Sequence, residues 1–89
     1  MPDNRQVAAT GERIARILAN EDFQDAIRSS QEQIRNEWEG SPVWARRKRE
    51  RLHQELGAMK RVLKRLRKSV TDGEVARAAL NKENINERR

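Results

Sequence analysis

A dense run of basic side chains is the feature of the sequence with the clearest chemistry. Five of the six residues from Arg46 to Arg51 are basic, and a leucine repeat follows directly. Guanidinium groups match the geometry of phosphate oxygens, and each neutralised phosphate releases counterions. Trp44 stands beside the run as a surface on which a base could stack. A solvated helix face that pairs with acidic side chains (Glu32, Glu37 and Glu39) explains the same residues, so two interpretations stay open.

A second basic cluster flanks the leucines and consists of Lys60, Arg61, Lys64, Arg65, Arg67 and Lys68. This cluster suits nucleic acid or an acidic protein surface, or it serves only to solubilise the helix. The stretch has few large apolar anchors outside the leucine positions, so no membrane partner is expected. The predicted phosphate-binding residues are Arg46, Arg47, Lys48, Arg49, Arg51, Lys60, Arg61, Lys64 and Arg65.

The arrangement of these residues differs from that of a leucine-zipper transcription factor. Such a protein needs an uninterrupted basic helix that reads bases, but Gly40 and Pro42 lie just upstream of the arginines. The leucine repeat also ends near Val70, which leaves it short.

Residues for catalysis or metal binding are sparse. His53 is the single histidine, and the chain has no cysteine, so no metal shell can be assembled around it. Neither a glycine-rich phosphate loop nor an HExxH motif occurs. The sequence therefore predicts a protein that is not an enzyme and that has no cofactor, metal or small-molecule ligand.

The elements that carry these side chains are predicted to be helices at about residues 10–19, 21–39, 42–70 and 74–81. Thr10 and Asn20 are the predicted N-caps of the first two, and Gly40 is predicted to end the second in the left-handed conformation. Pro42 suits a first helical position, and the segment from Thr71 to Gly73 is predicted to end the third helix. Residues 1–9 are predicted to be a flexible lead-in and residues 82–89 a polar tail.

Apolar spacing predicts how the helices pack. In residues 42–70 the apolar side chains alternate in steps of 3 and 4, with Arg49 as the only break. Gly57 is predicted to mark close packing against another backbone. The fold class is therefore all-α, an antiparallel hairpin spanning residues 10–80. Its predicted core and self-association residues are Leu18, Phe23, Ile27, Ile34, Leu52, Leu56, Met59, Leu63, Leu66 and Val70.

The loop between the two long helices is flanked by tryptophans. A hairpin folded about residue 41 would pair Trp38 with Trp44, although either side chain is also a candidate anchor for a partner. The same fold places a segment of net charge −3 (residues 10–40) beside one of net charge +9 (residues 41–70). Because a chain of 89 residues buries little surface, oligomerisation or a larger partner is expected.

Several sequence features together resemble a known group of proteins. They are ARILANEDFQDAI at residues 15–27, a tryptophan at residue 38, a Gly-Ser-Pro link, RERL at residues 49–52 and a leucine-rich helix closing at Thr-Asp-Gly. In these features the chain resembles small helical-hairpin proteins encoded in the head and packaging region of tailed bacteriophages and prophages. The resemblance implies a minor head or portal component, or an accessory of DNA packaging, found in the virion or in the host cytoplasm during assembly. The second helix is more basic than the pattern of that group.

Three functions are compatible with the sequence. The first is a structural hairpin that docks on itself or on a larger portal or capsid protein. The second is a DNA-binding packaging accessory, similar to a small terminase subunit, that uses the basic helix. The third is a small regulator that binds a host protein.

Overall fold

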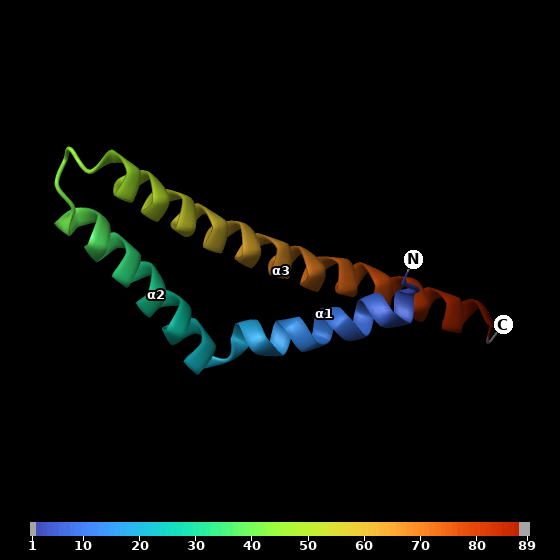
Figure 1. The fold of residues 1–89 in the computed structure, drawn as a ribbon. Helices are drawn as coiled ribbons and strands as arrows, with labels where there is room; N and C mark the ends of the chain where they lie inside the picture. Colours follow the sequence, from blue (N-terminus) through green and yellow to red (C-terminus); the bar gives the residue numbers. More distant parts are fainter. Residues whose placement is uncertain (1, 88–89) are drawn as a thin grey trace. The chain divides into compact units, whose positions relative to one another are not determined.

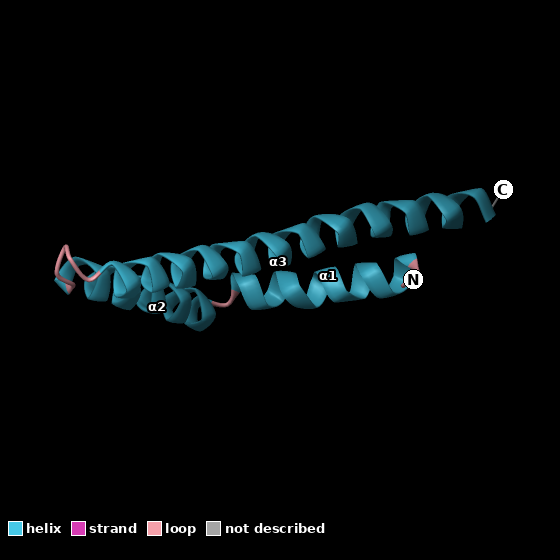
Figure 2. Cartoon of the chain, turned by 45° about the horizontal axis from the view of Figure 1, so that its top comes forward, coloured by secondary structure: helices cyan, strands magenta, loops and turns pink. Residues whose placement is uncertain are grey.

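The computed structural model describes residues 2–87 and consists of three helices joined by short loops (Figure 1). They are α1 (Asn4–Ala19), α2 (Glu21–Gly40) and α3 (Arg46–Glu87). Figure 2 shows no strand in this part of the chain. The prediction of an all-α chain is confirmed.

The contacts divide the chain into two compact units. We call residues 20–63 the loop unit, because it contains α2, the loop at 41–45 and the first part of α3. The terminal unit combines α1 with the remainder of α3, from residue 64 onward. Each unit is therefore a pair of helical segments. In the loop unit the two segments are joined by one loop, and in the terminal unit they are distant in sequence.

The first helix begins six residues earlier than the sequence analysis predicted. The Asp3 carboxylate accepts a hydrogen bond from the Gln6 backbone N–H at 2.9 Å, and the Gln6 side chain accepts one from the Asp3 N–H at 3.3 Å. This reciprocal pair is a capping box, which satisfies two N–H groups at the helix start. The predicted flexible lead-in over residues 1–9 is therefore wrong for residues 4–9, which are helical. The predicted N-cap at Thr10 is also wrong, because Thr10 lies inside α1.

Asn20 separates α1 from α2 as predicted. Its backbone is extended, and its side-chain oxygen accepts a hydrogen bond from the Phe23 N–H at 2.9 Å. Glu21 and Asp22 occupy the first turn of α2, where acidic side chains favour the positive end of the helix dipole. The N-cap at Asn20 is confirmed.

The loop between α2 and α3 differs from its prediction in two ways. Among the described residues no glycine has a positive φ, so Gly40 ends α2 without the left-handed conformation. Ser41 ends the helix instead, since its backbone N–H and its hydroxyl both donate to the Trp38 carbonyl, at 3.2 and 2.5 Å. A turn closed by the Ala45 N–H and the Pro42 carbonyl follows at 3.0 Å. That turn delays the start of α3 from the predicted residue 42 to Arg46.

The third helix continues through the segment predicted to end it. The Thr71 hydroxyl donates to the Arg67 carbonyl at 3.2 Å, a local bond compatible with helix, and Gly73 is buried. The predicted short helix over 74–81 and most of the predicted tail therefore belong to α3, which ends at Glu87. Residues 88 and 89 of that tail lie outside the described residues.

Little apolar surface is buried in either unit. Among the described residues the buried hydrophobic side chains are Ala8 and Ala76 in the terminal unit and Leu52 in the loop unit. None of the described helices is both long and apolar enough to span a bilayer.

Candidate interaction surfaces

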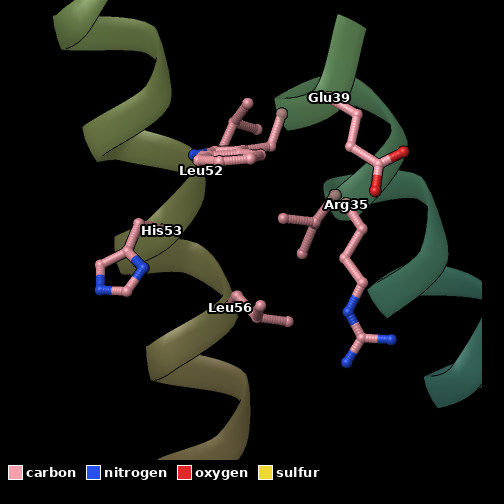
Figure 3. A pocket seen from close by; sticks show the side chains of 7 residues that line it. Arg35, Glu39, Leu52, His53 and Leu56 are labelled. Carbon is pink, nitrogen blue, oxygen red and sulfur yellow. The ribbon is translucent and has the colours of Figure 1, made fainter. Parts of the chain in front are cut away.

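An open apolar groove lies between α2 and α3 in the loop unit (Figure 3). Its floor is formed by apolar side chains from both helices: Ile34, Trp38, Leu52 and Leu56. Arg35 and Glu39 line it from α2, and His53 lines it from α3. In Figure 3 Leu56 points toward α2, whereas the His53 ring lies on the side of α3 away from α2. The groove therefore presents an apolar floor with charged groups along its α2 side.

Arg49, the break in the leucine pattern, stacks on Trp38. Its guanidinium carbon lies 3.9 Å from the centre of the indole ring. A planar cation over an aromatic face is attracted by the ring quadrupole, and its alkyl stem covers apolar surface. This contact explains how a charged residue occupies a position that the repeat reserves for apolar side chains. Arg49 is therefore less available for phosphate than the other arginines of the run, because it is half-buried.

The predicted core residues are incompletely covered. Leu52 is 2 % exposed, whereas the other nine are half-buried. Three of the ten, Ile34, Leu52 and Leu56, come together at the groove. Val70 lies instead in the terminal unit, where it lines a hollow with Ala8 and Gly11.

Gly57 does not contact another backbone, contrary to the prediction. A Cβ atom built on it would meet only the end of the Arg61 side chain, at 3.4 Å. This glycine is therefore not needed for helix packing.

The loop carries two largely exposed apolar side chains. Val43 is 85 % exposed and Trp44 is 83 % exposed. The predicted packing of Trp44 against Trp38 is thus wrong: Trp44 precedes α3 in the loop and Arg49 covers the Trp38 ring instead. We call residues 43 and 44 the apolar tip.

The basic side chains of α3 in the loop unit are exposed, except that of Arg49, and none of them has an acidic ion-pair partner among the described residues. Among the described residues the ion pairs are Arg28 with Asp25 and Arg77 with Glu12, and neither involves the run from Arg46 to Arg51. The expected pairing of this run with Glu32, Glu37 and Glu39 is therefore not found in that part of the chain. Of the nine predicted phosphate-binding residues, Arg49 alone is half-buried.

A close contact between two helix backbones in the terminal unit was missed by sequence reasoning. Gly11 of α1 and Gly73 of α3 meet backbone to backbone, since a Cβ atom on either would lie 2.9 Å from the Cα of the other. Glu12 and Arg77 form an exposed ion pair beside this contact. The available signal was small residues at helical spacing: Ala8, Gly11 and Ala15 on one segment and Ser69, Gly73 and Ala76 on the other.

Two candidate binding surfaces stand out among the described residues. Within residues 2–87 no three His, Cys, Asp or Glu side chains are grouped so that they could hold a metal ion. The two features that remain are the groove with its neighbouring tip and the exposed basic run. Comparison of the chain with protein-family models, curated proteins and solved structures gives no match.

Proposed function

We propose that this protein is a non-enzymatic structural or assembly component of tailed bacteriophages. In this proposal a helical hairpin docks on another copy or on a larger protein of the head or portal region. The phage context is supported by the sequence resemblance at residues 15–27, the Gly-Ser-Pro link and the RERL segment. The protein would act in the virion or in the host cytoplasm during assembly.

The exposure of large apolar side chains carries the docking part of the proposal. Three described hydrophobic residues are buried, while seven large ones are exposed: Ile17, Trp38, Val43, Trp44, Val62, Val75 and Ile85. Exposed aliphatic and aromatic groups gain free energy when a partner removes them from water, by about 25 cal/mol per Å². Tryptophan is also enriched among the residues that dominate binding energy at interfaces. A partner would thus supply the burial that the chain does not achieve by itself.

Purified phage particles provide the test of this function. Mass spectrometry should detect the protein at a defined number of copies per particle. A phage carrying Trp44→Ser should incorporate less of it, whereas one carrying Gln54→Ser, at an exposed polar position of α3, should incorporate the usual amount. Particles that lack the protein, from cells in which it is abundant, would contradict a structural role in the virion.

A DNA-binding packaging accessory is the second candidate, and the unpaired basic run favours it. Arg46, Arg47, Lys48 and Arg51 are exposed and form no ion pair among the described residues. If these side chains bind phosphates, affinity for duplex DNA should fall steeply with salt. Replacing all four by Gln should flatten that dependence, and an unchanged slope would exclude the run as the DNA contact.

A further inference from the structure

We infer that the groove between α2 and α3 receives the apolar tip of a second copy of this chain. This inference rests on the proposed function and specifies one docking partner, a second copy of the chain. It is based on two features of the same unit, an open apolar groove and a largely exposed Val43–Trp44 pair.

The lining of the groove, more than its size, favours an apolar side chain over a polar small molecule. Its volume is about 270 Å³. Sites for drug-sized ligands usually enclose roughly 300–1,000 Å³ and add several convergent polar groups. Here the floor is apolar, and the charged groups that line it, Arg35 and Glu39, come from α2 alone. An indole or an isopropyl group therefore suits the floor better than a polar metabolite.

The charges that surround the tip complement those that surround the groove. One residue, Ala45, separates the tip from Arg46, Arg47 and Lys48, which are all exposed. The groove is bordered by α2, which carries six acidic and two basic side chains and has Glu37 and Glu39 near its end. Among the described residues, no ion pair joins the basic side chains that follow the tip to the acidic side chains of α2. Opposite charges that do not meet within one chain would meet across an interface in which the tip of one copy enters the groove of the other.

This arrangement closes on itself. Each copy has one tip and one groove, so a two-fold axis lets both tips occupy both grooves at once. The product is a dimer in which Trp44 and Val43 cover the half-buried Ile34 and Leu56 of the partner copy. The basic run is then occupied by protein, which distinguishes the inference from the DNA-binding candidate.

Sedimentation of the full chain provides the test. The wild-type protein should sediment as a concentration-dependent dimer. Trp44→Ser should raise the dissociation constant by about tenfold or more, as expected for an interface anchor. Val62→Ser serves as the control, because Val62 is an exposed apolar residue of the same unit that lines neither the groove nor the tip. The dissociation constant of the Val62→Ser dimer should equal that of the wild type. Circular dichroism should show the same helix content for the wild type and both variants.

Charge reversal identifies the partner surface. One variant carries Arg46→Glu, Arg47→Glu and Lys48→Glu, and the other carries Glu32→Lys, Glu37→Lys and Glu39→Lys. Each variant alone should be monomeric, because its tip and its groove carry charges of the same sign. An equimolar mixture should form heterodimers in which both tip–groove contacts pair opposite charges. A wild-type chain that is monomeric at all concentrations would overturn the inference, as would a dimer that survives Trp44→Ser. A monomer that binds duplex DNA through the basic run would assign that surface to nucleic acid. A monomer present in phage particles would refute self-docking but leave the proposed function standing.

Discussion

Gly11 and Gly73 bring α1 and α3 together so closely that neither position has room for a side chain. A Cβ atom on Gly73 would lie 2.9 Å from the Gly11 Cα and 3.2 Å from the Val7 carbonyl oxygen. Both neighbours are backbone atoms, so no side-chain rotation can relieve the clash. The terminal unit therefore depends on two glycines that local propensity would disfavour in helices.

We predict that Gly73→Ala destabilises the protein. Overpacking typically costs about 1–3 kcal/mol, against a gain of up to about 1 kcal/mol in helix propensity. The melting temperature followed by circular dichroism should therefore fall, and amide exchange in α1 should accelerate. A higher melting temperature would mean that Gly73 and Gly11 are not in backbone contact in solution.

Gly57→Ala provides the matched control and should have the opposite effect. Only the flexible end of Arg61 lies near the new methyl group, at 3.4 Å, and the backbone has no positive φ. Alanine lowers the entropy of the unfolded chain and favours helix, so a gain of about 0.5–1 kcal/mol is expected. Urea denaturation should show a higher midpoint with an unchanged slope. A destabilised variant would reveal a contact at Gly57 that the chain alone does not make, such as a second copy.

These two glycines also show what the sequence could and could not predict. Helical periodicity identified the all-α class, and the side chain of Asn20 indicated an N-cap, because both depend on neighbours in sequence. Gly73 looked like a helix terminator beside Thr71 and Asp72, since its role depends on Gly11, which is distant in sequence. Arg49 looked like a defect in the repeat for the same reason: its partner, Trp38, is on another helix. The Asp3–Gln6 capping box was readable from the sequence but was overlooked among the polar residues at the start.

That capping box yields a third prediction. Asp3→Ala removes the acceptor for the Gln6 N–H, and loss of an N-cap side chain typically costs about 0.5–2 kcal/mol. The melting temperature should fall, and amide protons of residues 4–7 should exchange faster than those of α2. Asp3→Ser should retain most of the stability, because serine is also a good N-cap. Equal losses for Ala and Ser would argue against a capping role.

The stacking of Arg49 on Trp38 gives the fourth prediction. Arg49 is half-buried and Trp38 is 41 % exposed, so the contact is partly shielded from solvent. Cation–π pairs in such settings contribute about 0.5–2 kcal/mol. A double-mutant cycle with Arg49→Gln and Trp38→Leu should therefore give a coupling energy within that range. Arg51→Gln is the control: its side chain belongs to the same run but is exposed, and its substitution should leave stability within about 0.5 kcal/mol of the wild type. A coupling energy near zero would mean that Arg49 is held at this position by its alkyl stem alone, and its guanidinium would then be as free for phosphate as those of its neighbours.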